Sequence, residues 1–174
     1  MRPTRREFSV MIGLGALPLA PWVGGGRAFG QALGPVTNLP LPRYVSLRSS
    51  EINVRRGPGL NYPKDWVFRR AGLPVQVIEE YGDWREIVDS DGAGGWVYHA
   101  LLTGRRTVLI TAPKILLRRR PSEAEDATAE VHQGVVARLA ACRPAWCEVT
   151  IQDHRGWAPK TALWGVDPDE VFDR

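Results

Sequence analysis

One block of sequence occurs twice in this chain, and the repeat limits the possible folds more than any other feature. The first copy contains Asn-Val-Arg-Arg-Gly-Pro-Gly at 53–59, Asp-Trp-Arg-Glu-Ile at 83–87 and Gly-Trp-Val at 95–97. The second contains Leu-Leu-Arg-Arg-Arg-Pro at 116–121, Ala-Trp-Cys-Glu-Val at 145–149 and Gly-Trp-Ala at 156–158. The offset of about sixty residues indicates two copies of one small module.

The local pattern within each copy predicts β-strands. Runs such as 74–81 and 84–88 are short, rich in β-branched and aromatic residues, and separated by Gly- and Pro-containing turns. If Gly82-Asp83 is a hairpin turn, Ile78 lies across from Ile87 and their face is the predicted core. The fold class expected is all-β, with two tandem small β-barrels.

The repeat also sets the expected domain boundaries in the 174-residue chain. We expect a signal peptide over 1–30, an extended linker over the proline-containing stretch 31–43, a first module over 44–106, a second over 107–166, and a partly mobile acidic tail over 167–174.

The first thirty residues have the three parts of an export signal. A charged start is followed by an apolar run over 10–23 and by small residues at Ala28 and Gly30, after which we expect cleavage. The paired Arg5 and Arg6 are typical of the twin-arginine route. We therefore expect a periplasmic or secreted protein with no stable membrane insertion after cleavage, and an uncleaved N-terminal anchor is the alternative.

The net charge of +4 mostly belongs to this export segment. Four arginines and one glutamate leave +3 in the first thirty residues, so the rest of the chain carries +1. A nearly neutral chain gives no electrostatic reason to expect nucleic acid as a partner. The short arginine runs at 105–106 and 118–120 are more typical of a solvated face.

The repeated motifs resemble the bacterial SH3-like (SH3b) domain. Asn-Val-Arg-x-Gly-Pro-Gly at 53–59, a tryptophan in a central hairpin and Gly-Trp-Val at 95–97 carry the resemblance. The second copy departs from the pattern, since Arg120 stands where the first copy has Gly57. Two copies after an export signal resemble a family of two-module proteins from alphaproteobacteria. The resemblance implies small barrels of bent strands, a binding or scaffolding role beside cell-wall enzymes, and contact with peptidoglycan in some members.

Four aromatic residues of the first copy are the candidate ligand-binding residues. Trp84 is an odd number of residues from Ile87, and Trp96 is out of phase with Val97, so both are expected half-buried on the flank opposite the core. Tyr62 and Trp66 flank the Gly-Pro-Gly loop and could complete a groove. Flat aromatic rings suit sugar faces and extended peptides, although covering a small barrel is the alternative role for all four.

The two cysteines lie at a predicted hairpin tip. If Pro144-Ala145 is the turn, Cys142 and Cys147 face each other, at the positions where the first copy has Glu80 and Arg85. A disulfide is the leading interpretation for an exported protein. Free thiols are one alternative, and zinc held with His132 or His154 is another, although these histidines lack ligand spacing.

No set of residues indicates catalysis or a cofactor. The sequence has no Gly-x-Ser-x-Gly motif and no phosphate-binding glycine loop. We expect a non-enzymatic binding module without metal or cofactor, whose partner is peptidoglycan or an extended segment of an envelope protein. A cell-wall hydrolase and a structural partner in an envelope complex are the alternatives.

Overall fold

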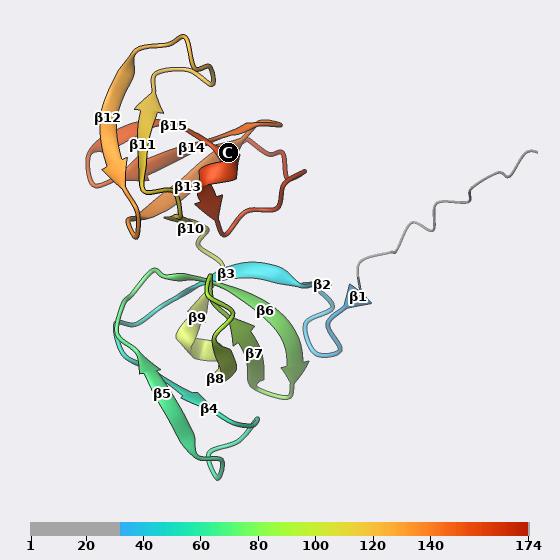
Figure 1. Cartoon of the computed structure of the whole chain (residues 1–174). Coiled ribbons are helices and arrows are strands. Elements are labelled where there is room, and N and C mark those ends of the chain that lie inside the picture. Colours follow the sequence, from blue (N-terminus) through green and yellow to red (C-terminus); the bar gives the residue numbers. More distant parts are fainter. Residues whose placement is uncertain (1–31, 174) are drawn as a thin grey trace, which may run out of the picture. The chain divides into compact units, whose positions relative to one another are not determined.

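The computed structural model describes residues 32–173, so the predicted export signal lies outside the described residues. Two seven-stranded antiparallel sheets account for most of the described chain (Figure 1). The first contains β3 (Arg43–Leu47), β4 (Ile52–Arg55), β5 (Lys64–Phe68), β6 (Pro74–Tyr81), β7 (Trp84–Val88), β8 (Gly94–Tyr98) and β9 (Leu102–Thr103). The second contains β10 (Thr107–Ile110), β11 (Lys114–Arg118), β12 (Ala127–His132), β13 (Val136–Cys142), β14 (Trp146–Ile151), β15 (His154–Pro159) and β16 (Leu163–Trp164).

The two sheets have the same topology strand for strand. The order β5-β4-β8-β7-β6-β3-β9 in the first corresponds to β12-β11-β15-β14-β13-β10-β16 in the second. A one-turn 3-10 helix, His99–Leu101 or Lys160–Ala162, precedes the last strand of each. The all-β prediction of two tandem SH3-like modules is confirmed.

A glycine precedes the tryptophan in both β8 (Gly95) and β15 (Gly156), and the reason is steric in both strands. Gly95 has φ of +151°, and a Cβ there would lie 2.8 Å from the carbonyl oxygen of Arg55. A Cβ on Gly156 would lie 2.8 Å from Leu117 Cβ. Glycine is therefore needed in both copies, where β8 approaches β4 and where β15 approaches β11.

Each barrel encloses its own apolar core. The first core consists of Leu47, Ile52, Val54, Phe68, Val75, Val77, Ile87, Val97 and Leu102. The second consists of fourteen buried residues, among them Val108, Ile110, Leu117, Leu139, Val149 and the two cysteines.

The predicted core position of Ile78 is wrong. Ile87 pairs with Val77, and the register shifts between Val77 and Glu79, so Ile78 is the extra residue of a β-bulge and is 40% exposed. The predicted contributions of Ile87 and Val97 hold, since both are fully buried.

In the stretch expected as an extended linker over 31–43, the described residues 32–43 contain local structure. Strands β1 (Ala32–Leu33) and β2 (Pro40–Leu41) pair with each other, and their turn lies against the first barrel. The second half of the sequence from 122 to 130 also belongs to a strand, β12.

The tail packs against the second barrel rather than extending freely. Phe172 and Cys142 exchange two backbone hydrogen bonds, of 2.8 and 3.1 Å. The ammonium group of Lys160, only 7% exposed, donates to the carbonyl oxygens of Pro168 and Glu170. The expectation of a partly mobile tail overlooked these contacts.

Both hairpin predictions at the cysteine-equivalent positions are confirmed. Cys142 and Cys147 are directly opposite and form a disulfide with a Cα–Cα distance of 4.1 Å. Glu80 and Arg85 are opposite in the first barrel, and Arg85 Nε lies 3.5 Å from Glu80 Oε1. Because both thiols are in the disulfide, they are not available to the zinc site considered with His132 or His154.

Candidate functional site

The strand register gives the first barrel an outer face that differs sharply from its core face. Arg85 opposite Val97 lies on the core side of the β7–β8 pair. The alternate pairs, Trp84 with Tyr98 and Glu86 with Trp96, must therefore project outward. Four side chains of two strands thus share one surface, which we call the outer face.

Trp84 and Tyr98 form an aromatic corner on this face. Their ring centroids are 5.8 Å apart and the ring planes are inclined at 74°. Tyr98 is 40% exposed and Leu60, from the Gly-Pro-Gly loop, is 79% exposed. Leu60, Trp84 and Tyr98 together line an open hollow of about 490 Å³. A flat ligand face could rest on one ring and meet the other edge-on.

Trp96 is the buried member of the outer face. It lies on the same face as Trp84, as its phase predicted, and it does not belong to the first core. However, it is only 9% exposed and not half-buried. It is therefore better suited to holding its neighbours than to touching a ligand.

The loop that presents Leu60 is held by an arginine and by a tyrosine ring. Arg55, paired with Trp96, donates from its guanidinium group to the carbonyl oxygens of Leu60 and Tyr62, at 3.1 and 2.7 Å. A Cβ on Gly57 would lie 2.5 Å from the Tyr62 ring, so the Gly-Pro-Gly sequence leaves room for that ring. Tyr62 itself is 41% exposed.

Trp66, the fourth predicted binding residue, lies elsewhere. It pairs with Val54, packs against the first core, and its ring centroid is 4.2 Å from that of Phe68. The structure therefore brings Trp84, Trp96 and Tyr62 to the outer face or its bordering loop and leaves Trp66 in a packing position.

Two carboxylates lie next to the aromatic corner. Glu79 and Glu86 are directly opposite across β6 and β7, on the outer face. Among residues 32–173 neither forms a salt bridge. Partial burial, the negative charge of Glu79 and a hydrogen bond shared with it raise the pKa of Glu86 above its usual range.

A histidine and an aspartate border the corner. The His99 ring lies 4.8 Å from the Tyr98 ring, and its Nε2 is 3.8 Å from an oxygen of Asp83. Both side chains are largely exposed, so this pair adds polar groups at the border of the hollow and little stability.

The second barrel repeats part of this arrangement and changes the rest. Its pairs Arg118–Trp157 and Glu148–Trp157 correspond to Arg55–Trp96 and Glu86–Trp96. Three further positions differ: Pro159 corresponds to Tyr98, Ala141 to Glu79 and Arg143, hydrogen-bonded to Trp146, to Tyr81.

Glu148 also has a partner that its counterpart lacks. Arg155 forms two hydrogen bonds with the Glu148 carboxylate, one of them 2.7 Å long. The position equivalent to Arg155 in the first barrel is Gly94. The first barrel therefore has an aromatic corner with uncompensated carboxylates, whereas in the second the carboxylate is neutralised and the corner is incomplete.

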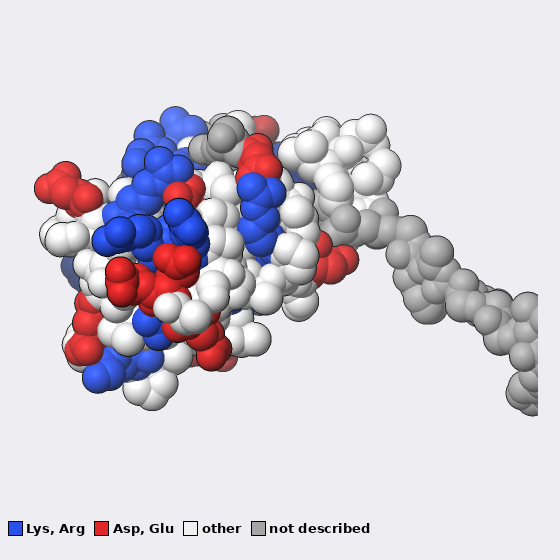
Figure 2. Space-filling view, turned by 90° about the horizontal axis from the view of Figure 1, so that it is seen from above, with Lys and Arg blue, Asp and Glu red and all other residues white. Residues whose placement is uncertain are grey.

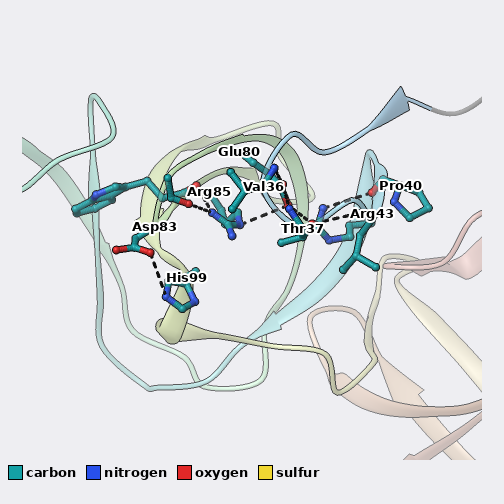
Figure 3. A network of polar contacts seen from close by, with 11 residues as sticks. Val36, Thr37, Pro40, Arg43, Glu80, Asp83, Arg85 and His99 are labelled. Atoms are coloured by element: carbon teal, nitrogen blue, oxygen red, sulfur yellow. Dashed lines mark hydrogen bonds and ion pairs between the residues drawn. The ribbon is translucent and has the colours of Figure 1, made fainter.

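A buried carboxylate fastens the N-terminal segment to the same hairpin. The side chain of Glu80 is fully buried and accepts hydrogen bonds from the backbone amides of Val36 and Thr37 and from the Thr37 hydroxyl, at 3.0, 2.9 and 2.6 Å. Arg43 approaches to 2.6 Å, and Arg85 lies on the opposite side (Figure 3).

The electrostatics of Glu80 fit a structural role. Burial alone would raise the pKa of this carboxyl, but the hydrogen bonds from Thr37, Arg43 and Val36 outweigh it and lower the pKa to about 2. Glu80 is therefore ionised at neutral pH, with its charge compensated, and it is not available as an acid or base.

On the face that Figure 2 shows, charges of both signs are mixed. Figure 2 shows Lys and Arg side chains close to Asp and Glu on one face of the molecule. In the 118–120 run, Arg118 donates to the carbonyl oxygen of Glu125, and Arg120 is 3.7 Å from the Glu125 carboxylate. Such local compensation is typical of a solvated face.

Comparison with known proteins agrees with the topology. The sequence profile of the bacterial SH3 domain matches residues 48–104 and 112–165. The chain belongs to the bacterial SH3 domain family. The two matched segments coincide with the two barrels, so this is a tandem pair of bacterial SH3 domains.

One similar curated protein is the putative N-acetylmuramoyl-L-alanine amidase YrvJ of Bacillus subtilis (strain 168). The alignment is 122 residues long with 27% identity, and it covers 64% of this chain. The match covers 23% of the amidase, so the chain spans about a quarter of that relative. In the described part of the chain, no helix has the length and apolar character needed to cross a bilayer.

Proposed function

We propose that this protein is an exported, non-enzymatic binding protein whose first SH3 domain attaches to peptidoglycan through its outer face. The observation that carries the proposal is the corner of exposed Leu60 and Tyr98 and half-buried Trp84, on a barrel whose own core is complete without them. Large aromatic groups left outside a complete core are typical of binding surfaces.

Two further points support a cell-wall ligand. The similar relative is named as a putative N-acetylmuramoyl-L-alanine amidase, and its name refers to a wall component. The N-terminal pattern with Arg5 and Arg6 favours export to the periplasm or beyond, where peptidoglycan lies.

Co-sedimentation with purified peptidoglycan sacculi tests the proposal. We expect the wild type to sediment with the sacculi, and Trp84→Ala and Tyr98→Ala to reduce the bound fraction at least tenfold. Trp146→Ala is the matched control, because Trp146 occupies the position of Trp84 in the second barrel, opposite Pro159. Circular dichroism of each variant establishes that it is folded. Equal binding of all variants would contradict the proposed face.

Two alternatives have their own readouts. The similarity to an amidase favours a cell-wall hydrolase as the second candidate. Release of soluble muropeptides from sacculi by the purified protein would support hydrolysis and contradict the non-enzymatic role. Stoichiometric co-purification with one envelope protein, without sedimentation on sacculi, would instead favour a partner in an envelope complex.

A further inference from the structure

The outer face of the first barrel carries an unusual arrangement of like charges. Glu79 and Glu86 are directly opposite across two strands, a placement in which two carboxylates repel each other. No salt bridge with either glutamate is found within residues 32–173. A like-charge pair of this kind breaks a local rule of strand pairing, and such violations are typical of functional sites.

The carboxylates and the aromatic corner can reach a single ligand. Trp84 and Glu86 are two residues apart on β7 and project from the same face, which separates their Cα atoms by about 7 Å. This is of the order of the width of one sugar ring. The hollow of Leu60, Trp84 and Tyr98 offers apolar and aromatic contact, and the adjacent glutamates offer negative charge.

From this charge complementarity we infer that the hollow takes an amino sugar with a free ammonium group, as part of a glycan strand. The sugar's C–H face packs on the Trp84 or Tyr98 ring, and its ammonium group lies between the carboxylates of Glu79 and Glu86. The aromatic rings also favour a nearby cation. A neutral N-acetylated sugar offers the same stacking face but leaves the two carboxylates uncompensated.

The second barrel provides an internal comparison. There Glu148 is already compensated by Arg155, Ala141 replaces Glu79, and Pro159 replaces Tyr98. A ligand ammonium group would have to displace a formed ion pair and would find no second ring. Only the first barrel is therefore expected to select a cationic sugar.

This inference rests on the proposed function, because it names the chemistry of the ligand at the same face. The test compares the glucosamine tetramer with the N-acetylglucosamine tetramer, which share a backbone and differ in the ammonium group. Binding is measured by isothermal titration calorimetry at low salt with the full mature chain. We expect the glucosamine tetramer to bind at least tenfold more tightly.

The variants separate charge from stacking. Glu79→Gln together with Glu86→Gln should abolish the preference for the glucosamine tetramer and leave binding of the acetylated tetramer within about twofold of wild type. Trp84→Ala should weaken both tetramers. Because the two glutamines remove a repulsion, the double variant should melt no lower than wild type, and unfolding would not explain its loss of binding.

Three results would overturn the inference. The acetylated tetramer could bind as tightly as the glucosamine tetramer, or the double glutamine variant could keep the preference. A lysine tetrapeptide that bound more tightly than the glucosamine tetramer would assign the site to a peptide cation instead. In each case, binding to sacculi that depends on Trp84 would leave the proposed function standing, whereas loss of that binding alone would remove the function itself.

Discussion

At the scale of single residues, two glutamates that are adjacent in sequence have opposite electrostatic situations. The Glu80 carboxylate is buried among hydrogen-bond donors, and its pKa is lowered to about 2. Glu79 faces another carboxylate across the strand pair. Alternation of side chains along β6 after the bulge puts one charge where it stabilises and the next where it repels.

The lowered pKa of Glu80 predicts a pH dependence of stability. Since the folded pKa is below the unfolded value of 4.5, the contribution is complete above pH 4.5 and is lost as the pH falls toward 2. The lost contribution is about 3 kcal/mol, the linkage equivalent of that difference. Urea unfolding between pH 6 and pH 2 measures it. In Glu80→Gln the free energy of unfolding should be lower at pH 6 and should vary less over this range.

Removing the charge of Glu86 should have the opposite effect. Its pKa is raised in the folded protein, so the charged form is disfavoured by folding, and stability falls as the pH rises through the raised pKa. Glu86→Gln should therefore increase the free energy of unfolding at pH 7 by about 0.2–1 kcal/mol. Thermal unfolding at pH 7 and pH 4 checks both parts, and a decrease in stability at pH 7 would contradict the assignment.

At the scale of elements, the two equivalent hairpins are closed by different chemistry. The β6–β7 hairpin has Glu80 opposite Arg85, and the β13–β14 hairpin has a disulfide between Cys142 and Cys147. In both copies a chain segment from outside the sheet packs at this point, the β1–β2 turn on Glu80 and Phe172 on Cys142.

Loss of the disulfide should destabilise the second barrel moderately. The bridge closes a loop of only six residues, for which loop entropy gives about 2 kcal/mol. Paired Cys142→Ala and Cys147→Ala substitutions, which leave no free thiol, should lower the free energy of unfolding by about that amount. Intact mass before and after reduction and alkylation verifies the bridge in the wild type. Alkylation of the unreduced protein would show that the bridge had not formed.

The tail is expected to contribute to stability through Phe172. This ring packs against the second core, and its backbone continues the hydrogen bonding of Cys142. Phe172→Ala should cost about 1–3 kcal/mol, less than a fully buried phenylalanine, because the ring is partly exposed. Val171→Ala, at an exposed neighbouring position, is the control in the same urea titration.

At the scale of the whole molecule, local rules predicted the barrels but not what covers them. The turns at Gly82-Asp83 and Pro144-Ala145 fixed which residues face each other, so the Glu80–Arg85 pair and the disulfide followed from the sequence. Ile78 was misplaced because a bulge adds a residue that no local pattern marks. The contacts of Thr37 and Phe172 could not be predicted, since they join segments far apart in the chain.

The candidate site was predicted in part. The phase of Trp84 and Trp96 identified the outer face, and the same alternation would have added Tyr98, two residues after Trp96. Leu60 has no such signal, because its position depends on the hydrogen bonds from Arg55 to its loop. The contrast between Glu86 and Glu148, which is hydrogen-bonded to Arg155, can be recognised only when the register of both barrels is known.

A buried hydroxyl pair connects the two halves of the molecule. The Oγ of Ser46 lies 2.6 Å from Thr107 Oγ1, and Thr107 donates to the carbonyl oxygen of Gly72 at 2.7 Å. Thr107→Val would remove the donor to the carbonyl oxygen of Gly72, whereas Ser46 Oγ keeps its hydrogen bond to the carbonyl oxygen of Arg105. The substitution should cost about 1–3 kcal/mol in urea unfolding. Thr103→Val, at a less buried threonine nearby, should cost less.

The different closures of the two equivalent hairpins make the barrels sensitive to different surroundings. Protonation of Glu80 at strongly acidic pH loosens the first barrel and leaves the disulfide of the second intact. A reducing compartment does the reverse, since it breaks the Cys142–Cys147 bond and does not affect a carboxylate. The chain thus contains one hairpin contact that is lost on protonation and another that is lost on reduction. The first barrel, which carries the candidate site, does not depend on oxidation to fold.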